Sequence, residues 1–587
     1  MSIRLNTLGT CVGVCLALAC AMTAPAWMAD HPSLIGHWGA LDLPGSVWAH
    51  WWVAHCFSEG ANPFVDTVSF VPFGLSPVHQ YNLLDAIVGS PWVRLAGPRL
   101  GYNLATLSAL TTTGVGGYAL ARSAGTGHRG ALFTAVAIQA SSAVSLELHE
   151  GRLSQFLLVF FLLTLAALIT LIRGDGGPRL AIGLGVCAAA TAGVYWYAAT
   201  YLFPAVLIIV FTHRSRLNRK HISSMAIAAA VGLALVLPFA IELFASWSTL
   251  PGVARNGSVT AIAGNPVSSL SGLQVAIDNS RWPLWPIVGS SNQEHGHQIS
   301  LLIVLLSLLA FRWKQPGRWT WLGIALVGWI MAMGPRLHGY TSTTSVSLPF
   351  DWLGTLFPPF TRMWWPQRFE ILTAIGLAVL AGAALDQWLT KKPKARVWWV
   401  LSMLIIVFDS PIRSGVLPIR ASPIPATNMN LYTDLEGPIF TTPVWPTVGQ
   451  LHRLRWFQTQ HELAYQNGNG EHIPSHRPPE FTEWMNRNGL IRALDDLKGT
   501  DHLTATIEPN DVQQLIDAGF NYAVVDPFVY GDEGGRIPAA THSRVFSQLW
   551  GSPFHTDRGG AVWRIEPIRG TIELTVKTAR RNDRMVQ

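Results

Sequence analysis

The sequence predicts an α-helical polytopic membrane protein with about eleven transmembrane helices and a small C-terminal exterior α/β domain. Three observations predict it: apolar runs of membrane length, basic clusters on alternate connections, and the end of the apolar runs near residue 412. Apolar runs lie near residues 7–27, 101–121, 131–148, 153–172, 180–194, 198–213, 222–245, 299–312, 319–335, 369–389 and 397–411. Each approaches the ~17–25 residues that a helix needs to cross ~30 Å of hydrocarbon.

The basic clusters set the expected orientation in the membrane. They lie at Arg122 and Arg129, at Arg173 and Arg179, and within 214–220, 312–318 and 391–396. Counted from Arg4, these connections all return to one side, which the positive-inside rule assigns to the cytoplasm. We therefore expect a multi-pass protein of the inner (cytoplasmic) membrane, with a cytoplasmic N-terminus and exterior loops at 28–100, 246–298 and 336–368.

Composition supports a membrane protein and argues against other classes. The 587 residues are 49% hydrophobic and 13% charged, with 25 Trp to populate the membrane interfaces. The net charge of +7 comes largely from the loop clusters, so nucleic-acid binding is not expected. Four of the five cysteines, Cys11, Cys15, Cys20 and Cys187, lie in predicted spans, and no disulfide framework is expected. We expect the run at 7–27 to be a retained helix rather than a cleaved signal peptide.

The chain divides near residue 412 into a membrane domain, 1–411, and an exterior domain, 412–587. The second part is rich in Pro, Asp, Arg and His. It contains strand-like runs at Pro438–Val444, Tyr522–Val525 and Ala561–Ile565, and a helix-like run at Asp511–Ala518. This order predicts a small periplasmic or exterior α/β domain.

The first long loop contains an aromatic helical pattern at about residues 44–58. One face of this helix would carry Trp48, Trp51, Trp52 and His55, so we expect it to lie flat in the membrane interface. Asp42 comes just before it. Two roles are open for this carboxylate: capping the helix N-terminus, or acting as a general base on a hydroxyl acceptor at the exterior membrane surface.

Several short motifs in a fixed order resemble one family. They are Asp42 with Trp48 and Trp51-Trp52, Asn62-Pro63-Phe64, Pro72-x-Gly74, Gly97-Pro98, Tyr102-Asn103, His149-Glu150-Gly151-Arg152 with Gln155, Pro366-Gln367-Arg368-Phe369 with the run 377–382, and Gln458-Thr459-Gln460-His461. Together they cover most of the chain, which resembles bacterial GT-C-type membrane glycosyltransferases.

The resemblance implies an inverting sugar transferase that takes its donor from a polyprenyl-phosphate carrier. Its acceptor would be a glycan, lipid or protein of the cell envelope, and its catalytic acid would be Asp42. The chain departs from the family at two places. Leu43 and Pro44 stand where many relatives have a second acid, and Trp364 stands where related chains often have an Arg.

A lipid-phosphate donor requires a cation at the exterior membrane surface. Arg152, Arg362 and Arg368 lie at exterior ends of predicted spans and offer bidentate phosphate geometry. The alternative for each is an arginine that snorkels at a helix end.

His149, Glu150 and Asp66 are further candidates for substrate binding. His149 and Glu150 lie at the level of Arg152, where a polar turn between two spans is the alternative. The segment Glu294-His295-Gly296-His297 does not place both imidazoles on one helical face. We therefore expect no metal site and no cofactor beyond the donor, and leave a divalent-ion requirement open.

Two other functions stay open. A non-catalytic envelope scaffold would keep the fold and lose only a few residues. A lipid or glycan transporter should show charged or broken spans at the midplane. Here the span interiors are nearly free of charge, which makes transport the weaker alternative.

Overall fold

The computed structural model describes residues 5–577 except for eleven internal segments. These are 40–41, 75–82, 175, 248–297, 339–342, 357–364, 393–394, 414–415, 469–477, 498–501 and 532–535. The segment 294–297 therefore lies outside the described residues, as does Arg362.

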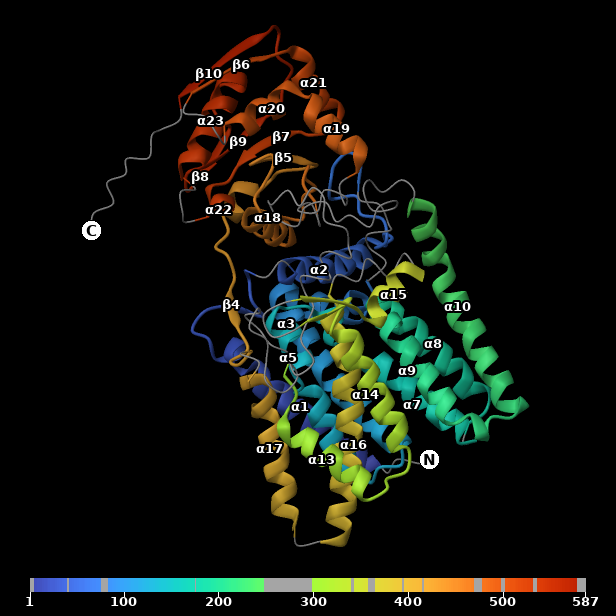
Figure 1. The fold of residues 1–587 in the computed structure, drawn as a ribbon. Helices are drawn as coiled ribbons and strands as arrows, with labels where there is room; N and C mark the ends of the chain where they lie inside the picture. Colours follow the sequence, from blue (N-terminus) through green and yellow to red (C-terminus); the bar gives the residue numbers. More distant parts are fainter. Residues whose placement is uncertain are drawn as a thin grey trace.

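Helices coincide with each apolar run that the sequence predicts to cross the membrane. They are α1 (Leu5–Met28), α3 (Leu84–Ser123), α4 (His128–Gln139), α5 (Ser142–His149), α6 (Leu153–Phe156), α7 (Val159–Ile172), α8 (Pro178–Val194), α9 (Trp196–Thr212), α10 (Arg219–Trp247), α13 (Leu301–Arg312), α14 (Arg318–Ala332), α16 (Glu370–Lys391) and α17 (Arg396–Arg413). Figure 1 shows them as one bundle. Among the described residues, five helical segments are long and apolar enough to cross a membrane, and four shorter apolar helices accompany them.

Two of the predicted spans are broken helices. Residues 131–148 are divided between α4 and α5, where Ser141 begins α5 by accepting a hydrogen bond from Val144 N. Residues 153–172 are divided between α6 and α7. Inside α3, Gly97 adopts φ +74° just before Pro98, so that helix is also kinked.

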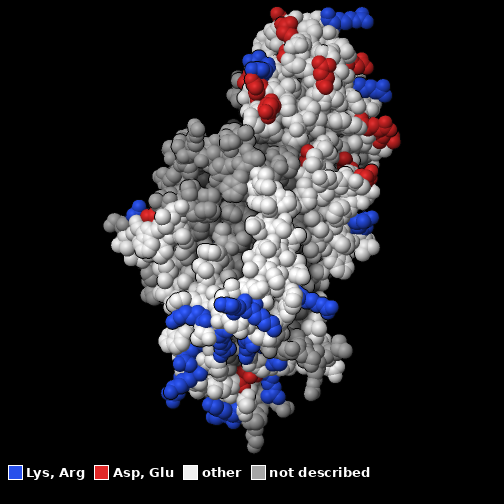
Figure 2. Space-filling view, turned by 90° about the vertical axis from the view of Figure 1, so that its right-hand side faces the viewer, with Lys and Arg blue, Asp and Glu red and all other residues white. Residues whose placement is uncertain are grey.

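The bundle surface matches a membrane environment. Lys and Arg gather at the end of the bundle away from the C-terminal region, and an almost uncharged band lies above them (Figure 2). Exposed apolar side chains cover α10, among them Leu233, Leu235, Leu237 and Ile241. Because such a surface is stable in hydrocarbon and costly in water, this is a multi-pass membrane protein.

Helix α2 (Leu43–Glu59) lies across the end of the bundle, between the bundle and the C-terminal region (Figure 1). The helix predicted at 44–58 is therefore confirmed. Its aromatic face differs from the prediction, because it is buried against protein. Trp48, Trp51 and Trp52 are each 3% exposed or less, and the Trp48 Nε1 donates to Gln458 Oε1 of α18 (Val448–His461) at 2.6 Å.

The region after α17 contains the predicted α/β structure. A four-stranded sheet has the order β5-β7-β9-β8, formed by Ile439–Thr442, Tyr522–Val525, Gly560–Arg564 and His555–Asp557. β5 and β7 are parallel, and the other neighbours are antiparallel. Helices α18, α19 (Pro479–Arg487), α20 (Gly489–Asp496), α21 (Pro509–Asp517), α22 (Pro527–Tyr530) and α23 (Arg536–Trp550) surround it, with a second strand pair of β6 (His502–Ile507) and β10 (Ile572–Lys577).

Short strands join this region to the bundle. β1 (Ser33–Ile35) pairs antiparallel with β4 (Ala421–Pro423), so the chain after α1 is tied to the chain after α17. On the same end of the bundle lie the hairpin of β2 (Arg336–His338) and β3 (Thr343–Ser347) and helix α15 (Pro349–Leu356). These contacts place the first long loop beneath the C-terminal region.

Candidate active site

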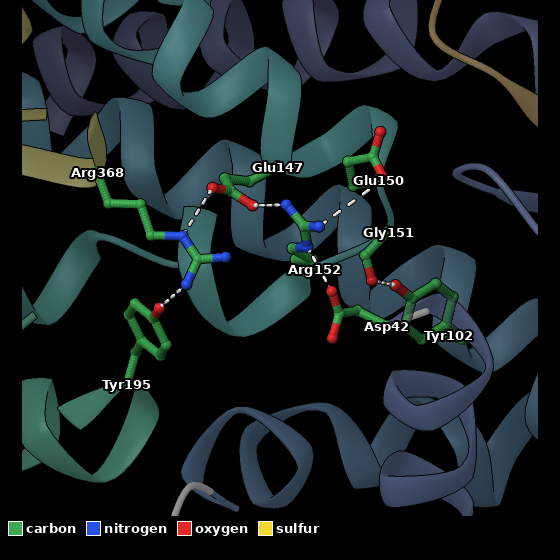
Figure 3. Close-up of polar contacts among 8 residues, drawn as sticks. All are labelled: Asp42, Tyr102, Glu147, Glu150, Gly151, Arg152, Tyr195 and Arg368. Atoms are coloured by element: carbon green, nitrogen blue, oxygen red, sulfur yellow. Dashed lines mark hydrogen bonds and ion pairs between the residues drawn. The ribbon is translucent and has the colours of Figure 1, made fainter. Parts of the chain in front are cut away.

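Asp42 occupies the N-cap position of α2 but does not cap it. Its side chain accepts no hydrogen bond from the first turn of the helix. Instead its Oδ2 lies 2.6 Å from Arg152 Nε (Figure 3), and the carboxylate side chain is 49% exposed. The capping role is therefore wrong, and Asp42 is instead paired with Arg152.

A tight turn between α5 and α6 positions Arg152. Gly151 has φ +73°, and a Cβ there would lie 2.6 Å from Leu43 Cδ1, so only glycine fits this approach to α2. The Gly151 carbonyl also accepts a hydrogen bond of 2.7 Å from Tyr102 OH (Figure 3). The turn is thus held against both α2 and α3.

Arg152 lies among three carboxylates. Besides Asp42, its guanidinium is 3.1 Å from Glu147 Oε2 and 3.9 Å from Glu150 Oε2. Burial lowers the pKa of Arg152, but the three carboxylates outweigh this and hold that pKa above its usual value. Arg152 is therefore a permanent cation that orients the acids around it.

Glu147 connects Arg152 to Arg368. Its Oε1 lies 3.6 Å from Arg368 Nε, and its side chain is only 7% exposed. Arg368 also donates to Tyr195 OH, and its guanidinium lies 5.7 to 6.0 Å from the rings of Tyr195, Tyr197 and Trp365. Figure 3 shows the resulting row Asp42, Arg152, Glu147, Arg368. The carboxylate and guanidinium groups alternate along it.

A small cavity of about 30 Å³ lies beside Glu147 and Arg368. Its lining also includes the polar residues Ser154, Gln155, Thr191, Tyr195 and Tyr201, and the apolar residues Ala143, Leu157, Leu158, Phe161, Val194, Ala198 and Ile371. The cation and the acid therefore face a space that has apolar walls on the bundle side. Polar and apolar residues contribute equally to the lining.

The other predicted site residues have different surroundings. His149 is buried, and its ring lies 6.3 Å from that of His37, whose Nε2 is 2.7 Å from Arg420 Nη1. Asp66 is 1% exposed, and its Oδ1 accepts backbone hydrogen bonds from Val68 and Ser69. Asp66 therefore orders a turn of the first loop, and its role in substrate binding stays a prediction.

Two residues of the site were not predicted from the sequence. Glu147 is an acid at the end of the apolar run 131–148, and an ionisable residue in such a run is itself a signal of function. Tyr195 begins the aromatic run Tyr195-Trp196-Tyr197, and nothing in the sequence indicates its contact with Arg368.

The described residues contain no group of three or more His, Cys, Asp or Glu side chains placed to hold a metal ion. Three carboxylates do converge in the site, those of Asp42, Glu147 and Glu150, but the Arg152 guanidinium lies between them. The positive charge between these three carboxylates is provided by the Arg152 side chain.

Comparison with known proteins identifies the fold. No protein-family model matches the chain, and no curated protein matches its sequence. The structure is similar to the apo crystal structure of the Archaeoglobus fulgidus oligosaccharyltransferase, with a TM-score of 0.51 and 10% identity over 97% of this chain and 75% of that one. It is also similar to the mycobacterial arabinofuranosyltransferase AftD, with a TM-score of 0.50 and 15% identity over 92% of this chain and 38% of that one.

Both similar structures are GT-C glycosyltransferases, so the predicted GT-C fold is confirmed. The chain spans well under half of AftD. At these identities the likeness concerns the fold, and the chemistry must be argued from the site.

Proposed function

We propose that this chain is a membrane glycosyltransferase that moves a sugar from a polyprenyl-phosphate donor to an envelope acceptor on the exterior face of the inner membrane. The observation that carries the proposal is the row of Asp42, Arg152, Glu147 and Arg368 at the end of the bundle where α2 lies. The basic residues gather at the other end of the bundle, which supports an exterior position for this end under the positive-inside rule. The donor's lipid confines its phosphate to the same level.

In the proposed reaction, Asp42 is the catalytic base. Its carboxylate is half exposed, so an acceptor hydroxyl can approach it from the exterior. The hydroxyl oxygen forms a bond to the anomeric carbon of the sugar, and the hydroxyl proton passes to Asp42. The bond from that carbon to the phosphate oxygen breaks on the opposite face, its electron pair stays on the phosphate, and the configuration inverts.

The two arginines are proposed to have different tasks. Arg152 contacts three carboxylates within 4.0 Å, so its charge is already balanced and it acts as a positioning residue for Asp42. Arg368 contacts one carboxylate, at 3.6 Å, and lines the cavity with apolar walls. Arg368 is therefore the better phosphate-binding residue, because a guanidinium can hold the departing phosphate next to the start of the lipid chain.

Mass spectrometry of envelope glycans tests the proposal. Glycans from a strain that lacks the protein are compared with those from strains expressing the wild type, Asp42→Asn or Glu59→Gln. Glu59 is the matched control, since it is an exposed acid at the other end of α2. We expect one sugar to be lost from the deletion and Asp42→Asn strains and retained with Glu59→Gln.

Two outcomes would count against the proposal. Unchanged glycans in the deletion strain would contradict transferase activity and favour the scaffold. Loss in the deletion strain that Asp42→Asn fully restores would keep the transferase but remove Asp42 as its base.

A further inference from the structure

A second, larger cavity lies at the basic end of the bundle, away from the proposed active site. It has a volume of about 460 Å³, which is within the ~300–1,000 Å³ usual for small-molecule sites. Its walls come from the end of α3, the end of α7, the α13–α14 connection, α14 and α16. The lining residues are Ala124, Gly125, Thr126, Arg173, Gln315, Pro316, Trp321, Val379, Leu380, Ala383, Asp386, Gln387, Thr390 and Lys391.

Two basic side chains of the lining, Arg173 and Lys391, are available to bind an anion. Arg173 follows α7 directly, and its Nη1 donates to the Ser123 carbonyl. Lys391 ends α16, and its Nζ lies 5.5 Å from the centre of the Trp313 ring. Within the described part of the chain, neither residue forms an ion pair with a carboxylate.

The acidic side chain that lines the cavity, Asp386, already accepts hydrogen bonds from the backbone. Asp386 accepts backbone hydrogen bonds from Gly127 at 3.0 Å and from Gly130 at 3.3 Å, both at the start of α4. A carboxylate at a helix N-terminus is balanced by the helix dipole and by the amide groups it accepts from. The cavity therefore favours an anion, since its two cations are not neutralised by its acid.

The inner wall is apolar. Trp321, Val379, Leu380 and Ala383 line the cavity from α14 and α16. Gln315 stays near the rim, where its Nε2 donates to Gln387 Oε1 at 2.8 Å. A charged rim above an apolar wall suits a molecule with an anionic head and hydrocarbon behind it.

We propose that this cavity binds an anionic phospholipid of the cytoplasmic leaflet. Its phosphate pairs with Arg173 and Lys391, and its glycerol and first acyl carbons lie against Trp321 and Leu380. The basic residues gathered at this end of the bundle place it at the membrane surface that carries anionic lipids (Figure 2). An inorganic phosphate shares the anionic chemistry, but it would leave the apolar wall without a partner.

Native mass spectrometry of the purified full chain tests the site. The protein is reconstituted in nanodiscs of phosphatidylcholine with increasing phosphatidylglycerol, and the retained lipids are counted. The double variant Arg173→Gln, Lys391→Gln is compared with Arg179→Gln, Lys392→Gln. The control removes two exposed cations of the same two connections that do not line the cavity.

We expect the wild type and the control to retain phosphatidylglycerol in preference to phosphatidylcholine. The cavity double variant should bind it about 30-fold more weakly, because each cation near an anionic lipid contributes roughly fivefold in affinity. Ala383→Leu keeps both cations and narrows the cavity, so it should also reduce retention.

Three outcomes would overturn the inference. Equal losses in the two double variants would show general surface attraction rather than a site. Undiminished retention in both the cavity double variant and Ala383→Leu would place the lipid elsewhere. Inorganic phosphate can also be added to the same nanodiscs as a competitor. If it displaced phosphatidylglycerol as readily as an added glycerophospholipid does, the apolar wall would contribute nothing to binding.

Discussion

The carboxylate of Asp42 lies 2.6 Å from the guanidinium of Arg152, across 110 residues of sequence. The first residue precedes α2, and the second follows the Gly151 turn between α5 and α6. An acid in that position would ordinarily cap its helix. Here the carboxylate is instead directed toward the turn between α5 and α6, where it meets Arg152.

Replacing Asp42 by Asn should reduce turnover by about 10²–10⁴-fold, the usual contribution of a positioned base. Donor binding should change little, because the proton is transferred only in the transition state. Single-turnover rates and donor affinity of the purified variant in detergent would test this. A variant with undiminished turnover would exclude the base role.

Replacing Arg368 by Gln should weaken donor binding as well as rate, because the phosphate is already charged in the ground state. Loss of a hydrogen bond to a charged group predicts a donor affinity lower by about 10- to 100-fold. Arg152→Gln is the comparison, and it should lower turnover with a smaller effect on donor affinity. Equal effects of the two variants on affinity would contradict the separate tasks.

Chelation should leave transfer unchanged. The reason is that Arg152 already provides a fixed positive charge between Asp42, Glu147 and Glu150. Turnover is measured before and after treatment with EDTA, with added Mg²⁺ or Mn²⁺ as the control. Activity that is lost with EDTA and restored by one ion would show that a metal ion shares these carboxylates.

The contact between Trp48 and Gln458 should contribute to stability. Gln458→Ala leaves the buried Trp48 Nε1 without its acceptor, at a cost of about 1–3 kcal/mol. It also removes the hydrogen bonds that Gln458 Nε2 donates to the carbonyls of Val68 and Leu463, so the total loss should be larger. Gln460→Ala is the matched control, because that side chain is exposed and, within the described residues, its one hydrogen bond is to its neighbour Thr459. Unfolding of the full chain in detergent measures both, and equal stability of the two variants would count against the contact.

Two titratable groups in the C-terminal region, one partly and one fully buried, predict opposite pH effects. Burial lowers the pKa of His461 from 6.5 to about 3, so its contribution to stability is present above pH 6.5 and is lost as pH falls toward 3. Burial raises the pKa of Asp526 from 3.8 to about 6, so its contribution is present below pH 3.8 and is lost as pH rises through 6. Each proton contributes a slope of at most about 1.4 kcal/mol per pH unit.

Variants separate these two effects. Relative to the wild type, His461→Gln should gain stability as pH falls from 6.5 to 4, and Asp526→Asn should gain stability as pH rises from 4 to 6. Unfolding of the full chain at several pH values provides the measurement. Differences that do not vary with pH would show that neither group titrates as the burial predicts.

Local patterns were sufficient to predict much of this structure. Apolar length predicted the helices, the aromatic spacing predicted α2, and the run 522–525 predicted β7. Asp42, Arg152 and Arg368 were all predicted to lie at one level of the membrane, and the structure brings them into one row. The depth of a residue in the membrane can be inferred from the sequence, because every spanning helix crosses the same thickness of bilayer.

Contacts that depend on packing were not predicted. The aromatic face of α2 was expected at the lipid interface, but it packs against α18, whose Gln458 lies 410 residues further along the chain. Glu147 was missed as the bridge between two arginines, because the break after α4 that orients it is not marked by Pro or Gly. Periodicity within one segment carries no information about which distant segment will cover it.

The long separation between Trp48 and Gln458 also has a consequence for biosynthesis. At about 5–20 residues per second, the 410 intervening residues take roughly 20–80 s to synthesise. During that time α2 has no α18 to cover its three tryptophans, and indole rings favour the headgroup layer. The membrane surface therefore serves as a temporary partner for α2, and the proposed active site is completed only after the whole bundle has been inserted.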